Sequence, residues 1–142
     1  MPPKRPKRDS RPGVDRAGRT PLHYAAVDGD RAAVEQLLRD GADPSARDDD
    51  NNTPLHFAAQ EWHVDVADIL IRAGAEVDAI DDHGNTPLCR AVFESRGRGD
   101  LIALLRASGA DPLRTNQHGA SPLSLARTIS NFDVAQFFAD LP

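Results

Sequence analysis

A short motif recurs four times along this chain at a nearly constant spacing. The copies begin at Thr20, Thr53, Thr86 and Ser121, so the steps between them are 33, 33 and 35 residues. A period of this length is typical of one supersecondary unit stacked on copies of itself. The repeat therefore predicts an elongated solenoid, and a solenoid offers a long binding surface more often than a closed pocket.

The residues of the motif indicate a particular kind of repeat more specifically than the period does. The first two copies read Thr-Pro-Leu-His, and the later ones read Thr-Pro-Leu-Cys and Ser-Pro-Leu-Ser. A Gly-Ala-acid triplet follows the first three copies, at 41–43, 74–76 and 109–111. Together these features resemble the ankyrin repeat over residues 15–142. The resemblance implies an all-α solenoid of stacked helix-turn-helix units with hairpin-like finger loops.

The chain divides into a leader and four units. Residues 1–14 contain five basic residues, one acid and four prolines, with little to bury, so we expect a disordered basic leader. The expected units of the repeat domain have approximate bounds 15–47, 48–80, 81–115 and 116–142. The third unit has two extra residues near 95–99, where a longer, mobile loop is expected, and the shortened fourth unit is expected to cap the stack.

Turn and capping residues predict two helices in each unit. Thr20 is a favourable N-cap, and Pro21 suits the first helical position, where its missing N–H leaves no bond unmade. Gly41 is expected to end the second helix. A residue that tolerates positive φ stands in the turn before each motif; these residues are Gly18, Asn51, Gly84 and Gly119.

Charge is distributed unevenly between the leader and the body. The net charge is −5, of which the leader contributes +4 and the remaining residues −9, and both lysines lie in the leader. An acidic body repels nucleic acid, so only the leader is suited to bind it. The same field attracts a protein partner with a basic surface.

Other sequence features indicate the cellular compartment in which the protein is expected. Cys89 is the single cysteine, so an internal disulfide is excluded and a reducing compartment is expected. The sequence has no apolar run long enough to span a membrane and no apolar segment after the basic leader that would make a secretory signal. We expect a monomer in the cytoplasm, or in the nucleus if the source is eukaryotic.

His23, His56 and Cys89 occupy one position of the repeat, and stacking would align them in a row that suggests a metal site. The resemblance favours another reading, because this histidine in ankyrin repeats bonds to backbone groups of neighbouring turns. The sequence also lacks the spacings of a zinc protease, a phosphate-binding loop or a nucleophile elbow. We therefore expect no metal, no cofactor, no catalytic residues and no enzyme activity.

Candidate partner-binding positions are those that change between units. Aspartates cluster in two successive fingers, at 48–50 and 78–82, either as an ordinary solvated face or as an acidic contact surface. Trp62 stands where the first unit has Gly29, so its ring is either an exposed anchor or folded over neighbouring repeats. The candidates are Val27, Asp28, Asp49, Asp50, Asn52, Gln60, Glu61, Trp62, Asp82, His83, Asn85, Phe93 and Glu94.

These observations predict a non-catalytic module that binds another protein through its fingers and concave helix face. One specific form is an inhibitor or immunity-type protein that covers a basic enzyme, a role that some small bacterial ankyrin proteins resemble. Two alternatives remain open. A general scaffold or adaptor would use the same face without charge complementarity, and a nucleic-acid-associated protein would act through the basic leader.

Overall fold

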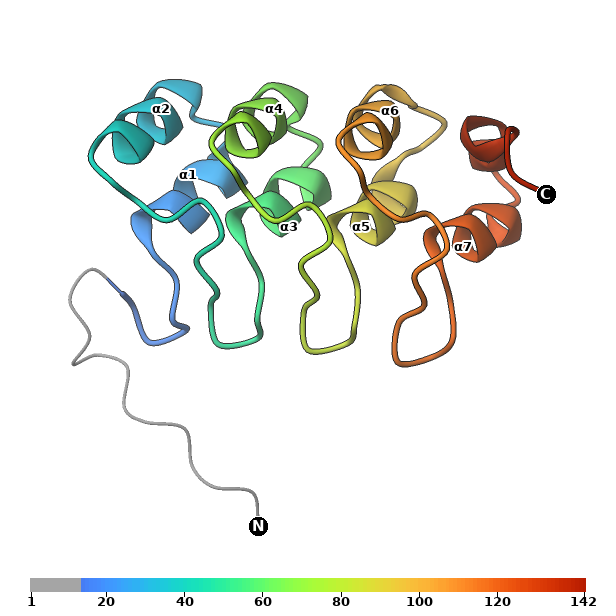
Figure 1. Cartoon of the computed structure of the whole chain (residues 1–142), viewed down its shortest axis with the longest axis horizontal. Coiled ribbons are helices and arrows are strands. Elements are labelled where there is room, and N and C mark those ends of the chain that lie inside the picture. Colours follow the sequence, from blue (N-terminus) through green and yellow to red (C-terminus); the bar gives the residue numbers. More distant parts are fainter. Residues whose placement is uncertain (1–13) are drawn as a thin grey trace, which may run out of the picture.

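The computed structural model describes residues 14–142 as a row of paired helices (Figure 1). The expected leader, residues 1–14, lies outside the described residues except for Val14. The helices are α1 (Pro21–Asp28), α2 (Arg31–Arg39), α3 (Pro54–Gln60), α4 (Val64–Arg72), α5 (Pro87–Glu94), α6 (Asp100–Ala107) and α7 (Pro122–Thr128), followed by the 3-10 helix η1 (Val134–Phe138).

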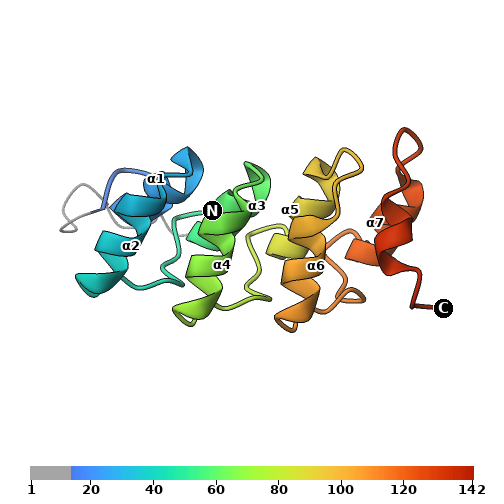
Figure 2. The ribbon, with the colours of Figure 1, turned by 90° about the horizontal axis from the view of Figure 1, so that it is seen from above.

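The helices form two layers. Helices α1, α3, α5 and α7 pack side by side in an inner layer, and α2, α4, α6 and η1 cover them as an outer layer (Figures 1 and 2). Loops between units project from the opposite side of the inner layer as fingers (Figure 1). No strand occurs within residues 14–142, so the prediction of an all-α solenoid is confirmed.

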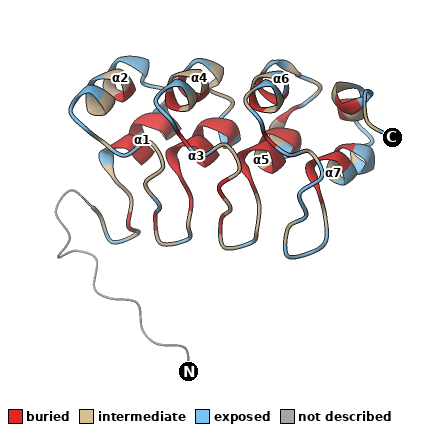
Figure 3. Ribbon diagram, in the orientation of Figure 1, coloured by how far each residue is buried: buried red, intermediate tan, exposed pale blue. Residues whose placement is uncertain are grey.

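The core lies between the two layers and continues through the stack. Buried residues concentrate on the inner helices (Figure 3). Alanine pairs such as Ala58 and Ala59 are fully buried there, and their small side chains let neighbouring helices pack closely. Leucines of the outer helices, including Leu70 and Leu105, close the core from the other side.

The motif residues begin each inner helix as the sequence predicts. Thr20 and its counterparts accept the N–H three residues later, and proline follows at the first helical position. The imidazole Nδ1 of His23 accepts the Thr20 N–H, and that of His56 accepts the Thr53 N–H, at 3.0 and 3.1 Å. The turn residues Gly18, Asn51, Gly84 and Gly119 all have positive φ, between 62° and 76°.

The same histidines join neighbouring units. Nε2 of His23 lies 2.9 Å from the carbonyl oxygen of Asn52, and Nε2 of His56 lies 2.9 Å from that of Asn85. Each ring therefore accepts one backbone bond through Nδ1 and donates another through Nε2. Because both nitrogens already have backbone partners, these histidines are structural and have no nitrogen left for a metal ion.

The loop of the third unit is held by several contacts. Ser95 is buried, its carbonyl oxygen accepts the Arg98 N–H at 2.8 Å, and Phe132 packs against Gly97. Gly99 lies so close to the ring of Phe137 that a Cβ there would overlap it. The loop that contains the two extra residues thus contacts the fourth unit through Gly97 and Gly99.

The fourth unit differs from the others in its outer layer. Its second helix is the 3-10 segment η1, in which Val134 and Phe138 are buried. Arg106 of α6 reaches across to this unit, bonding the Phe137 carbonyl at 2.9 Å and the Asp140 carboxylate at 2.7 Å. The fourth unit is therefore attached to the third through this short segment.

Candidate functional site

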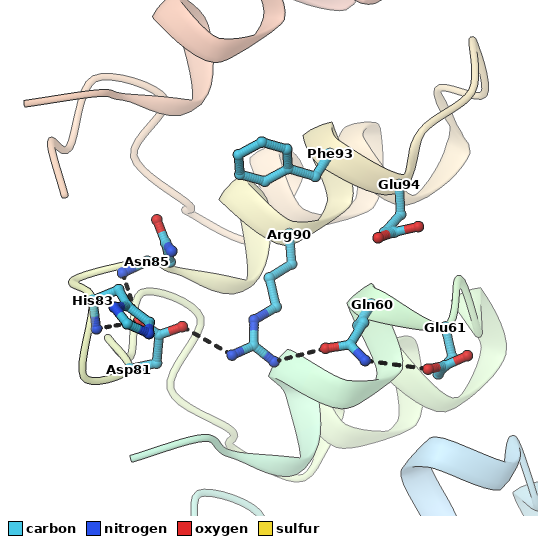
Figure 4. Close-up of a pocket in the computed structure, with 8 residues that line it drawn as sticks. All are labelled: Gln60, Glu61, Asp81, His83, Asn85, Arg90, Phe93 and Glu94. Atoms are coloured by element: carbon cyan, nitrogen blue, oxygen red, sulfur yellow. Dashed lines mark hydrogen bonds and ion pairs between the residues drawn. The ribbon is translucent and has the colours of Figure 1, made fainter. Parts of the chain in front are cut away.

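An open groove runs along the inner helices between the second and third units. Its volume is about 510 Å³, and it is lined by Gln60, Glu61, Asp81, His83, Asn85, Arg90, Phe93 and Glu94 (Figure 4). Six of these residues are among the positions predicted from sequence. The groove thus combines residues from two inner helices and one finger, as the repeat leads one to expect.

Arg90 organises the floor of the groove. Its guanidinium lies 2.8 Å from the Asp81 carboxylate and 3.2 Å from Oε1 of Gln60 (Figure 4), and it also donates to Oδ1 of Asn52. The guanidinium also sits 5.9 Å from the ring centroid of Phe57, within the range of a cation–π contact. Arg90 therefore connects the second unit to the finger of the third.

Asp81 is a buried carboxylate whose charge is compensated. Burial by itself raises the pKa of Asp81, but the bond from Arg90 and the backbone N–H groups of Asn85 and His83 outweigh burial, so the pKa is lowered. The carboxylate is thus ionised and paired inside the protein. It contributes little net charge to the groove, because the neighbouring guanidinium balances it.

The negative charges of the groove that no cation balances lie at the end away from the finger. Glu61 and Glu94 extend from the ends of α3 and α5, away from the finger residues (Figure 4). The Glu61 carboxylate receives only a 3.3 Å bond from Gln60, its neighbour in sequence, and the Glu94 carboxylate has no bonding partner among residues 14–142. Phe93, which precedes Glu94 on α5, is 58% exposed, and its ring extends toward the finger side of the groove (Figure 4). The groove therefore presents carboxylates at one end and an uncovered aromatic ring nearer the finger.

The structure separates the finger aspartates into two kinds. Asp48 is buried and accepts N–H bonds from Asp50 and Asn52, as Asp81 does one unit later. Asp50 is exposed, whereas Asp49 and Asp82 are half-buried. Only part of each acidic run therefore faces solvent.

Backbone bonds also join successive fingers. The Asp49 N–H donates to Ala17, the Asp82 N–H to Asp50, and the Gln117 N–H to His83, all over 2.9–3.0 Å. Residues at these finger positions thus set the spacing between units. Finger side chains add to this at two junctions, where Nδ2 of Asn51 donates to Asp82 over 2.6 Å and Nε2 of Gln117 donates to the Asp82 carbonyl over 2.6 Å.

Asn52 is a candidate partner-binding residue that is buried in the structure. The residue is only 7% exposed, and its amide bonds to Asp48 while its Oδ1 accepts from Arg90. The position therefore ties units together and offers nothing to a partner. The sequence did not reveal this, because the cation that fills the site comes from the next unit.

Trp62 is folded over the following unit rather than standing free. Its φ of 59° matches the 67° of Gly29, so an aromatic residue occupies a left-handed position that favours glycine. Nε1 donates to Asp100 over 3.1 Å, and the guanidinium of Arg98 stacks on the ring at 4.3 Å from its centroid. These contacts support the second of the two readings, a bridge between the second and third units.

The remaining candidates lie beside the groove. Val27 is half-buried, and its carbonyl oxygen accepts from Nε2 of His63 over 3.0 Å. Asp28 is exposed at the end of α1, in the place that Glu61 and Glu94 occupy in the next units. Acidic ends therefore recur on three adjacent inner helices.

Sequence reasoning missed Arg90 and Asp81 as groove residues. A signal for Arg90 was present, because it occupies the motif position that holds Tyr24 and Phe57 in the first two units. Phe57 is buried at this position, so a charged residue that takes its place requires a compensating partner, and Asp81 is that partner. The identity of this pair depends on how two units meet, which the repeat period alone does not specify.

Comparison with known families agrees with the geometry. A family model described as ankyrin repeats, in three copies, matches residues 22–116, about two-thirds of the chain. The chain therefore belongs to the ankyrin-repeat family. Ankyrin repeats are generally protein–protein interaction modules and are typically non-catalytic. No curated protein matches the chain, and no helix within residues 14–142 is long and apolar enough to cross a membrane.

Proposed function

We propose that the chain is a non-catalytic module that binds the basic surface of another protein along its inner helices and fingers. The groove between the second and third units carries this proposal, because the exposed ring of Phe93 and the carboxylates of Glu61 and Glu94 line it together. Partly exposed aromatic residues surrounded by polar side chains are typical of protein interfaces. The −9 charge of the body favours a basic partner over an acidic one.

The specific role that we propose is inhibition. A module of this kind would cover the basic substrate-binding surface of an enzyme such as a nuclease toxin, and it would act as a cytoplasmic monomer without metal or cofactor. The preformed groove supports this role, since a rigid surface loses little conformational entropy on binding. Its paired floor, Arg90 with Asp81, needs no rearrangement before a partner arrives.

Affinity capture on the full chain tests the proposal. Wild type is compared with Glu61→Gln/Glu94→Gln and with Phe93→Ala. Asp133→Asn is the control, because Asp133 is an exposed acid of the fourth unit whose carboxylate bonds to no other side chain among residues 14–142. We expect the same basic protein to be retained by wild type and the control and lost by the groove variants.

Salt dependence separates this function from that of a neutral scaffold. The affinity of the captured protein is measured from about 0.05 M to about 0.5 M salt, where screening shortens from ~14 Å to ~4 Å. We expect at least a tenfold weakening across this range. A partner whose affinity hardly changes, or which binds the doubly neutralised groove as well as wild type, contradicts the proposal.

A further inference from the structure

Arginine guanidinium groups lie on most of the aromatic rings of this protein. The chain has seven aromatic residues, which are one Trp, one Tyr and five Phe. Four of their rings have a guanidinium carbon 4.3–6.0 Å from the ring centroid, within the range of a cation–π contact. These four residues are Tyr24, Phe57, Trp62 and Phe138. The fold therefore uses the same pairing at several of its contacts.

Phe93 differs from these residues because its ring is mostly uncovered. Phe132 and Phe137 also lack a guanidinium among residues 14–142, but they pack against Gly97 and Gly99 of the third-unit loop. The Phe93 side chain is the most exposed of the large apolar side chains in the part of the chain that the structure describes, and no guanidinium from that part lies over its ring. The ring is thus open to a cation supplied by another molecule.

Helix α5 places this ring on the same face as charged groups. Arg90, Phe93 and Glu94 are spaced three and four residues apart, so their side chains leave the helix on one face and line the same groove. The lining contains one arginine and the three carboxylates of Glu61, Asp81 and Glu94, which gives a formal charge of −2 with histidine neutral. The groove therefore combines an exposed aromatic face with an excess of negative charge, and both attract a cation.

The positive charge of Arg90 does not exclude a second guanidinium from the groove. Its bond to the Asp81 carboxylate, over 2.8 Å, balances that charge. Phe57 shows that two guanidinium groups share one ring in this fold, since those of Arg19 and Arg90 lie 5.1 and 5.9 Å from its centroid. A guanidinium placed on Phe93 would repeat an arrangement that the fold already contains one unit earlier.

We propose that the partner inserts an arginine whose guanidinium stacks on the Phe93 ring, while further basic residues of the partner face Glu61 and Glu94. This inference rests on the proposed function for its surface, and it adds the residue type that the groove selects. A guanidinium is planar and weakly hydrated, so it stacks on an aromatic face, whereas the ammonium of lysine is compact and strongly hydrated. The ring therefore distinguishes between two partners of equal charge, and the carboxylates do not.

Two labelled peptides of equal length and charge, hexa-arginine and hexa-lysine, are the probes. Their affinities for the full chain are measured at low salt by fluorescence anisotropy, and the ratio of the two affinities is compared between variants. Phe93→Leu removes the aromatic face and keeps an apolar side chain at an exposed position, so little packing is lost. Phe132→Leu is the matched control, because Phe132 is an exposed phenylalanine of the fourth unit that does not line the groove.

We expect wild type to bind hexa-arginine more tightly than hexa-lysine. Phe93→Leu should lose about two- to fivefold of this preference, which is the contribution of a cation–π contact at an exposed site, and Phe132→Leu should keep it. Glu61→Gln/Glu94→Gln should bind both peptides more weakly and preserve their ratio. Hexa-arginine should also shift the ring proton resonances of Phe93 more than hexa-lysine does.

Equal affinities of wild type for the two peptides would overturn the inference, as would absence of binding by both. A preference for hexa-arginine that persists unchanged in Phe93→Leu would also overturn it, because another surface would then be its source. Equal affinities leave the proposed function intact, since a basic partner without an arginine anchor would still bind. The proposed function fails on a different result, in which Glu61→Gln/Glu94→Gln binds both peptides as tightly as wild type.

Discussion

Nε2 of His56 in the second unit donates a hydrogen bond to the carbonyl oxygen of Asn85 in the third, over 2.9 Å. The imidazole is buried, and burial, together with the nearby charge of Arg90, lowers its pKa from 6.5 to about 4. Burial also lowers the pKa of His23, which makes the equivalent bond one unit earlier. The stack therefore depends on neutral histidines at two of its junctions.

Acid is predicted to loosen these junctions before most carboxylates titrate. The unfolded chain takes up a proton at His56 near pH 6.5 and the folded protein only near pH 4, so stability is complete above 6.5 and falls as the pH drops through this window. Between pH 7 and pH 5 we expect His56 to account for a loss of about 2 kcal/mol in the free energy of unfolding. Urea denaturation at both pH values measures it.

The matched variant is His56→Gln, which keeps a side-chain donor and removes the titration. It should be less stable than wild type at pH 7 and show a smaller loss between pH 7 and pH 5. If wild type and His56→Gln lose the same free energy of unfolding over this interval, the histidine is not the source of the pH dependence.

Removal of the Arg90 charge is predicted to destabilise the protein through Asp81. Arg90→Met keeps the alkyl chain and leaves a carboxylate that is only 3% exposed without its cation, which costs about 2–3 kcal/mol. Asp81→Asn on the Arg90→Met background should recover part of this loss. A double-mutant cycle by urea denaturation gives the coupling, and additive single effects would show that the two side chains do not interact.

Neutralising the carboxylate of Glu94 at the C-terminal end of α5 is predicted to stabilise the fold. Glu94→Gln removes a negative charge from the C-terminal end of α5, and we expect a gain of about 0.3–1 kcal/mol at low salt. Arg72→Gln at the end of α4 is the opposite case and should be destabilising. Thermal melting at low and at high salt measures both effects, which should shrink as salt screens the charges. If Glu94→Gln destabilises the protein instead, Glu94 has a packing role and the prediction is wrong.

Gly99→Ala tests the contact between the third-unit loop and the fourth unit. Gly99 has a φ of −118°, which any residue adopts, so the obstacle is the ring of Phe137. We expect a cost of about 1–3 kcal/mol from overpacking. Phe137→Leu should cost stability alone but relieve part of the Gly99→Ala defect when combined with it, and a combined loss as large as the sum would contradict the proposed overlap.

The sequence predicts those parts of the fold that depend on residues within one unit. Thr20 as a cap and Asn51 at positive φ follow from local chemistry, and both are confirmed. Contacts between units were less predictable. Asn52 looks like a polar surface residue until Arg90, 38 positions later, is placed against it.

Trp62 is another residue whose contacts with a neighbouring unit the sequence did not predict. Its alignment with Gly29 correctly indicates a tight turn, but the sequence left open whether the ring is free. The answer depends on Asp100 and on the two-residue insertion that brings Arg98 over the ring. An insertion in one unit thus decides the exposure of a side chain in another.

Bonds cross every junction of the stack. The finger-to-finger backbone bond recurs at all three, and side chains add to it through His63 at the first junction, Arg90 and Trp62 at the second, and Arg106 at the third. In a one-dimensional description of a repeat protein, the two terminal units differ from the others because each has a neighbour on one side only. Thermal opening should therefore begin at either terminus and move inward, so that partially melted molecules still retain an intact groove.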